Sequence, residues 1–230
     1  MQLKTILNRV EPYKSSVFRS CRLVEEVKGQ PRIEVTIEPR ANGRPICSGC
    51  RRVRPGYDRL PVRQFEFVPL WAIPVIFLYA MRRVNCPICG VTVEEVPWGD
   101  GRCTLTKSYR WFLARWARRL SWKETAEVFG TTLEKVFQAV KYAVLSGLAQ
   151  RQLRRIKAIG IDEIQSRQGH KYLTLVYQID HGVKRLLWIA QDRTEQSLQQ
   201  FFTYLGSSRK SGRLRFTCSD MWKVRHSNLE

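Results

Sequence analysis

Residues 159–163 read Ile159-Gly160-Ile161-Asp162-Glu163, a short apolar run that ends in two acidic side chains. The run belongs to a strand candidate over 158–164, and further strand candidates follow at 172–179 and 185–190. An amphipathic helix over 195–205 and a fourth strand over 213–219, ending at Asp220, complete the pattern. An acid on the first strand and another at the end of the fourth is the order that begins a ribonuclease-H-like α/β domain with a mixed sheet.

Asp162 and Asp220 are the candidate catalytic residues and the candidate magnesium ligands. In such a domain they come from adjacent central strands, and carboxylate oxygens suit hard cations such as magnesium or manganese. Two bound ions would activate a nucleophile and stabilise the leaving oxygen at a phosphodiester. Glu163 is a poorer ligand, because successive strand residues point to opposite faces. Either aspartate taken alone is also explained as a turn former.

Basic and aromatic residues alternate at helical spacing from Leu105 to Leu120. Ser121 with Glu124 forms a capping box for a second helix that stops at Gly130, and Thr131 or Thr132 caps a third helix. Small Ala126 at the helix contact, Gly130 at the turn and Val136 in the core fit the spacing of a helix-turn-helix. A helical hairpin that happens to contain a glycine is the alternative.

If the third helix enters the major groove of double-stranded DNA, its outward residues read base edges and neighbouring cations contact phosphates. The predicted DNA-binding residues are Arg110, Arg115, Arg118, Arg119, Thr132, Glu134, Lys135, Gln138 and Lys141.

Two C-x-x-C pairs lie upstream of these helices, Cys47 with Cys50 and Cys86 with Cys89. Four thiolates in two such pairs suit a structural, tetrahedral zinc ion. Two unrelated cysteine pairs in a reduced core are the alternative, and a redox motif lacks its βαβ context. We expect a β-rich zinc ribbon made of loops and short strands, with one earlier strand over 32–38.

The chain has 230 residues, with 40 Lys and Arg against 20 Asp and Glu, which gives a formal net charge of +20. Such a balance indicates a polyanionic partner, nucleic acid first, although a merely basic soluble protein has the same sum. No secretory signal is visible at residues 1–10, so we expect a cytoplasmic protein. The apolar stretch 65–81 contains two prolines and Glu66, and we interpret it as β structure and not as a membrane span.

The predicted organisation is therefore an α+β multidomain protein. Its expected parts are an N-terminal segment over 1–40 with one strand, a zinc-ribbon-like domain over 41–100, a helix-turn-helix over 104–150 and a partial ribonuclease-H-like domain over 156–230.

Several strings in this order carry a family resemblance. Besides the paired cysteines and the helix-turn-helix, they are 160–164, 169–174, 192–194 and Ser219-Asp220-Met221-Trp222-Lys223. Between about residues 40 and 223 the chain resembles the bacterial insertion-sequence transposases of the L-three family. The resemblance implies a DDE transposase, in which zinc ribbon and helix-turn-helix recognise terminal inverted repeats and an Asp, Asp, Glu triad cleaves and joins strands.

The third acid of that triad has no counterpart here, since 224–230 end the chain without the family's long continuation. We therefore expect a truncated copy from an interrupted or frameshifted gene, with little or no catalysis of its own. Exposed apolar surface on the partial domain would favour self-association. The alternatives are a DNA-binding transcriptional regulator without catalysis and a nuclease that draws its third ligand from another chain.

Overall fold

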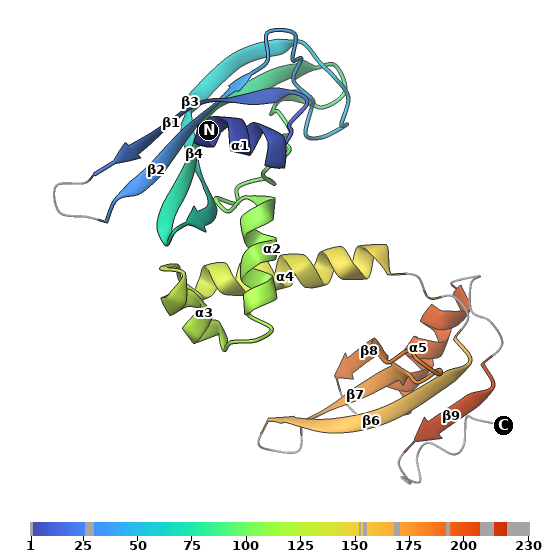
Figure 1. Cartoon of the computed structure of the whole chain (residues 1–230). Helices are drawn as coiled ribbons and strands as arrows, with labels where there is room; N and C mark the ends of the chain where they lie inside the picture. The colour runs from blue at the N-terminus through green and yellow to red at the C-terminus, as the bar shows by residue number, and fades with distance from the viewer. Residues whose placement is uncertain are drawn as a thin grey trace. The chain divides into compact units, whose positions relative to one another are not determined.

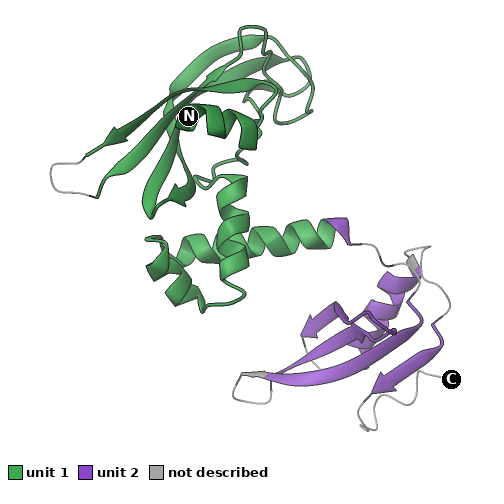
Figure 2. Ribbon diagram, in the orientation of Figure 1, with its two compact units in different colours: residues 1–149 green, residues 150–230 purple. Residues whose placement is uncertain are grey.

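The computed structural model describes residues 2–25, 30–151, 153, 156–167, 171–191, 194–207 and 214–219. The chain divides into two compact units, residues 1–149 and 150–230 (Figure 2). Each unit has a mixed sheet of its own. Figure 1 labels the helices and strands in chain order.

The sheet of the first unit has strand order β1-β2-β4-β3, with β5 paired to the far end of β4. Its strands are β1 (Ser16–Val24), β2 (Arg32–Pro39), β3 (Gly56–Leu70), β4 (Ile73–Cys86) and β5 (Gly90–Val93). Only β2 and β4 run parallel; the other pairs are antiparallel. The strand predicted over 32–38 is thus confirmed, and so is β structure over 65–81.

One face of this sheet is apolar and supports the first core. Period-two alternation brings every second side chain to the same side, so that β2 and β4 both contribute buried rows to it. Helix α1 (Leu3–Val10) joins this core through Leu7, and the fully buried Trp98 packs edge-on against Phe65 and Tyr79. The strand residues buried in this core are Phe18, Ile33, Val35, Ile37, Phe65, Phe67, Val75, Phe77, Tyr79 and Met81.

Strands β3 and β4 form a long hairpin, and the expectation of only short strands over 41–99 was wrong. They contain 15 and 14 residues and turn through Trp71 and Ala72, whose φ angles are 51° and 62°. Positive φ at both central positions is the geometry of the favoured hairpin turn, which Asn or Gly usually occupies. Because Trp and Ala are poor signals for such a turn, the hairpin is not visible in the sequence.

The first 40 residues contain more structure than the one strand expected there. Helix α1 and strand β1 precede β2, and Asn8 ties them together by accepting from the backbone N–H of Phe18 and donating to its carbonyl oxygen, both at 3.2 Å. Both elements were missed because few of their residues are buried: Leu7 alone in α1, and chiefly Ser16 and Phe18 in β1. They share their core with strands that follow residue 40.

Three helices follow the sheet: α2 (Lys107–Trp116), α3 (Trp122–Val128) and α4 (Leu133–Gln150). Ser121 accepts from the backbone N–H of Glu124 while the Glu124 carboxylate accepts from that of Ser121, so the predicted capping box is confirmed. Gly130 turns the chain with φ 56°, and Thr132 caps α4 by accepting from Lys135 N–H at 3.3 Å. The first helix ends at Trp116, four residues earlier than the periodicity suggested.

The second unit has strand order β8-β7-β6-β9, with helix α5 (Glu195–Ser207) packed on one face. Strands β6 (Ala158–Arg167), β7 (Lys171–Gln178) and β8 (Arg185–Gln191) form an antiparallel meander. Strand β9 (Phe216–Ser219) returns parallel to β6. These elements confirm the predicted order, and α5 is amphipathic as expected, with Leu198, Phe201 and Leu205 buried in the core.

Candidate functional site

The four predicted ligand cysteines converge in the first unit. The sulfur atoms of Cys47, Cys50, Cys86 and Cys89 all lie within 4.8 Å of one another, and the Cys50 and Cys86 Sγ atoms are 3.6 Å apart. Cys86 ends β4 and Cys89 precedes β5, while Cys47 is bridged to Glu94 just beyond β5. The strand pairing therefore brings the two C-x-x-C turns together, and the group could hold a metal ion.

Backbone geometry around the cysteines fits their convergence. Cys47 N–H donates to the Arg52 carbonyl at 2.9 Å, and Arg51 N–H donates back to the Cys47 carbonyl at 2.8 Å, which closes the first turn. A Cβ added at Gly49 would lie 2.8 Å from Cys89 Sγ, so only glycine leaves room for the second pair. Gly90 has φ 72°, a conformation that L side chains rarely adopt.

The surroundings favour the thiolate form at two of the four cysteines, Cys86 and Cys50. Burial raises the pKa of the Cys86 thiol, but hydrogen bonds from the backbone N–H groups of Cys89 and Ile88 outweigh it and bring the pKa down to about 6. At Cys50 a hydrogen bond from the backbone N–H of Arg52 lowers the pKa, and the Arg54 guanidinium, 3.9 Å from the sulfur, acts in the same direction. Burial and the neighbouring sulfurs raise the pKa of Cys89. The cluster therefore stabilises thiolates at Cys86 and Cys50, and a bound cation would offset the repulsion from neighbouring sulfurs that raises the pKa of Cys89.

A buried polar network lies beside the cluster and was not anticipated. The Glu94 carboxylate accepts from Tyr79 Oη at 2.8 Å and from Arg82 Nε at 2.9 Å, and Arg82 Nη1 reaches the Gly43 carbonyl. Because Glu94 is bridged to Cys47, this network ties the first cysteine turn to β4. A glutamate and an arginine twelve positions apart give no sequence signal, since the strand pairing alone brings them together.

The predicted DNA-binding residues of α4 fall into two groups. Thr132, Glu134, Gln138 and Lys141 are exposed, and Gln138 Nε2 donates to Glu134 Oε1 at 2.6 Å. Lys135 instead turns to the sheet, where its Nζ lies 2.7 Å from Glu66 Oε1 on β3. It joins the helix to the sheet and is not free at the outer surface.

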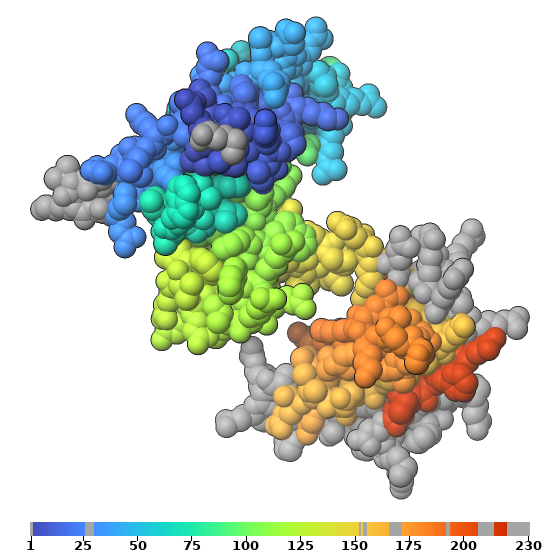
Figure 3. All heavy atoms as spheres, in the orientation of Figure 1, coloured from blue at the N-terminus to red at the C-terminus, as the bar shows by residue number. Residues whose placement is uncertain are grey.

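The predicted arginines of α2 and of the turn after it divide in the same way. Arg110 is buried; it pairs with Asp100 and stacks 3.6 Å over the ring centre of Tyr142 in α4. Arg115, Arg118 and Arg119 are exposed and, with Phe112 and Trp116, line a surface hollow of about 590 Å³. Figure 3 shows the side chains of α2 and α3, in green to yellow-green, as one continuous surface.

Of the two predicted acidic residues in the second unit, the structure describes Asp162. Asp162 is exposed on β6, and its Oδ1 accepts from the Glu163 backbone N–H at 2.7 Å. Asp220 lies outside the described residues; Ser219, its neighbour in the chain, pairs with Ile161 in the parallel β6–β9 ladder. Within the described part of the chain, the cysteines form the one group of three or more potential metal ligands.

Two other acids of the second unit, Asp180 and Glu195, belong to a turn and a helix start. Asp180 accepts from Gln178 Nε2 and from Lys157 N–H, and these bonds lower the pKa of its carboxyl. Glu195 begins α5. Asp192 lies outside the described residues.

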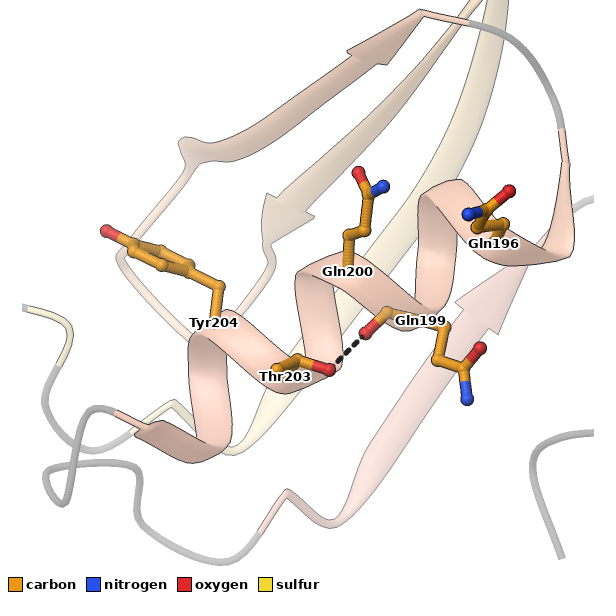
Figure 4. Close-up of a pocket in the computed structure, with 5 residues that line it drawn as sticks. All are labelled: Gln196, Gln199, Gln200, Thr203 and Tyr204. Carbon is orange, nitrogen blue, oxygen red and sulfur yellow. Dashed lines mark hydrogen bonds between the residues drawn. The ribbon is translucent and has the colours of Figure 1, made fainter.

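A second surface hollow, of about 420 Å³, lies on the outer side of α5. Figure 4 shows Gln196 and Gln200 pointing to one side of the helix and Gln199 to another, while Thr203 Oγ1 donates to the Gln199 carbonyl at 2.9 Å. The five lining residues, Gln196, Gln199, Gln200, Thr203 and Tyr204, include no acid or base suited to catalysis.

No helix in the described residues is long and apolar enough to cross a membrane.

Comparison with known proteins connects these features. A family model described as "Transposase" matches residues 159–227, the segment that begins with β6. The chain is also similar to the "Transposase for insertion sequence element IS1557" of two Mycobacterium tuberculosis strains, CDC 1551 and H37Rv, each 31% identical over 201 residues. The alignment covers 85% of this chain but 44% of each relative, so the chain spans less than half the length of these curated proteins.

Proposed function

Because this chain belongs to the insertion-sequence transposases of the L-three family, we propose that it binds the terminal inverted repeats of its element and contributes carboxylates to metal-dependent cleavage and joining of DNA. The parallel pairing of β6 with β9 inside the matched segment carries this proposal. A regulator that only binds DNA has no need of this strand pair.

The strand register supports the proposed acidic site. Gly160 pairs with Cys218 and Ile161 with Ser219, so equivalent residues of the two strands share a face. One further step along both strands leads to Asp162 and Asp220, which we propose to be neighbours on the face opposite α5. Asp162 supports this orientation, since its neighbour Ile161 is buried with the α5 core while Asp162 itself is exposed. The strand order is that of the first four strands of a ribonuclease-H-like domain.

Magnesium or manganese is the proposed cation of this site. The donor set fits, because both residues offer carboxylate oxygens and the arrangement of strands leaves Asp162 open to solvent. A divalent ion bound there would supply the positive charge that phosphodiester attack requires. The residues of this chain would hold that ion and fix its position relative to the DNA backbone.

Zinc is the proposed ion of the cysteine cluster, in a structural role. Tetrahedral zinc with bonds of about 2.3 Å requires sulfur atoms about 3.8 Å apart. The 3.6 Å between Cys50 and Cys86 and the 4.8 Å limit on the whole group fit that requirement. Bound zinc would lock the turn at 47–50 to the β4–β5 hairpin.

For DNA recognition, we propose that the first turns of α4 lie in the major groove. Gln138 is the principal base-reading candidate, since its amide is exposed and oriented by Glu134. Arg115, Arg118 and Arg119 are the proposed phosphate contacts. Arg110 and Lys135, which are bonded within the unit, are proposed to position α4 rather than to touch DNA.

Two measurements on the full chain test this function. Fluorescence anisotropy with the element's own ends should show salt-dependent binding that exceeds binding to unrelated duplex. Iron(II), substituted for magnesium in the presence of hydrogen peroxide and ascorbate, should cut the protein backbone near residue 162 by locally produced hydroxyl radicals, and Asp162→Asn should abolish the cut. The matched control, Glu163→Gln, changes the adjacent acid and should leave the cut in place. Binding without any localised cut would leave a DNA-binding protein with no catalytic metal site.

A further inference from the structure

The hollow on α2 combines an aromatic floor with a rim of arginines. Trp116 ends the helix and is 38% exposed, so part of its indole ring meets solvent. Phe112 and Phe129 pack against it with ring centres 6.4 and 5.6 Å away. This bracing holds the indole at the surface and in one orientation.

The arginines of the hollow have no acidic partner among the described residues. Some other arginines of the first unit do pair with acids, as in Arg82–Glu94 and Arg83–Asp58. Arg115, Arg118 and Arg119 are exposed, and no acidic side chain in the described part of the chain lies within salt-bridge distance of them. Three such cations around one cavity indicate an anionic ligand.

Resting on the DNA binding proposed above, we infer that this hollow takes one unpaired DNA base, stacked on Trp116, while Arg115, Arg118 and Arg119 hold the flanking phosphates. Stacking on an aromatic ring requires an exposed base face, and in an intact duplex both faces are covered by neighbouring pairs. Phosphate contacts to duplex alone would need the cations but not the braced indole.

The first test compares two DNA probes in fluorescence anisotropy: an intact duplex end of the element, and the same end carrying a short single-stranded extension. The full chain should bind the extended probe about tenfold more tightly at equal salt. Trp116→Ala should remove that difference and leave the affinity for intact duplex within about twofold of wild type, whereas Trp116→Phe should keep most of it. The control is Trp71→Ala, because Trp71 is 85% exposed at the β3–β4 turn and outside the hollow.

A second test does not depend on how the variants fold. A 5-iodouracil base placed in the single-stranded extension should crosslink to Trp116 or Phe112 under long-wave ultraviolet light, as mapped by mass spectrometry. Crosslinks confined to other residues, or equal affinity for both probes with duplex binding intact, would overturn the inference and leave the proposed function standing. Loss of salt-dependent binding to both probes by the wild-type chain would overturn the two together.

Discussion

Lys135 of α4 and Glu66 of β3 are joined by a salt bridge of 2.7 Å. Glu66 also holds the start of α2 through its backbone, accepting from Thr106 N–H and donating to the Thr104 carbonyl. One strand residue therefore fixes two of the three helices to the sheet, and the helix proposed to read DNA belongs to the same rigid framework as the cysteine cluster.

Breaking this bridge should weaken both folding and DNA binding. Because both side chains are about one-third exposed, we expect Lys135→Ala to cost about 1 kcal/mol of unfolding free energy in urea titration. It should lower affinity for specific and unrelated duplex alike, since α4 loses its fixed orientation. A double-mutant cycle with Glu66→Gln isolates the pair. The exposed pair Lys123 and Glu127 is the control, and an equal coupling energy there would contradict the assigned role.

Arg110→Ala should reduce the stability of the fold, whereas Arg118→Ala should reduce DNA binding. Arg110 is buried between Asp100 and the Tyr142 ring, so its loss should cost about 2 kcal/mol of stability. Arg118 is exposed and has no acidic partner in the described residues, so its loss should leave stability unchanged and reduce the slope of log affinity against log salt by about 1. Thermal melting and salt-dependent anisotropy separate the two, and a stable Arg110→Ala protein would contradict the burial argument.

Gln138→Ala should relax sequence preference without loss of fold. The side chain is exposed and its amide hydrogen-bonds to Glu134, so its removal disturbs no core. We expect discrimination between the element's end and a single-base variant to fall by about 1–3 kcal/mol at one position. Competition binding with a set of such variants provides the measurement. Uniform weakening across the set would place Gln138 on the phosphate backbone instead.

Metal analysis of the purified chain should give one zinc ion per chain. Gly49→Ala should reduce zinc retention, because the new methyl group would lie 2.8 Å from Cys89 Sγ. Gly101→Ala is a suitable control: its positive φ makes the substitution locally strained, but no atom lies near its added Cβ. If Gly49→Ala binds zinc as tightly as the control, the cysteine turns do not close around one ion as proposed.

Lowering the pH should reduce the stability of the first sheet, because Glu34 becomes protonated. This buried carboxylate on β2 accepts hydrogen bonds from Arg22 and Arg32, and these bonds, that from Arg22 first, lower its pKa below the ordinary 4.5. Its stabilising contribution is therefore complete above the ordinary carboxyl pKa and is lost as pH falls through the lowered value.

Glu34→Gln should accordingly destabilise the protein at pH 7 and matter progressively less as pH falls below the ordinary carboxyl pKa, as measured by urea unfolding. Glu38→Gln is the control, because that residue and its partner Arg19 are largely exposed. A destabilisation by Glu34→Gln that is independent of pH would mean that shape, and not charge, explains its effect.

Local chemistry made much of this fold predictable. The capping box at Ser121, the left-handed Gly130 and the alternating strands of the second unit each depend on neighbours within a few positions. What could not be predicted depends on distant partners. Nothing in the sequence near Arg110 distinguishes it from Arg118, and only tertiary packing withdraws it against Tyr142. Likewise, the Trp71–Ala72 turn adopts backbone angles that its residue types disfavour.

The parallel pairing of β6 with β9 also has a consequence during synthesis. Between the two strands the ribosome must deliver β7, β8 and α5. Until β9 arrives, β6 presents a row of unsatisfied amides and carbonyls that any extended peptide nearby can capture. During this interval the nascent chain can pair β6 with a strand of another molecule. The yield of correctly folded protein should therefore depend on how quickly translation proceeds through residues 171–216.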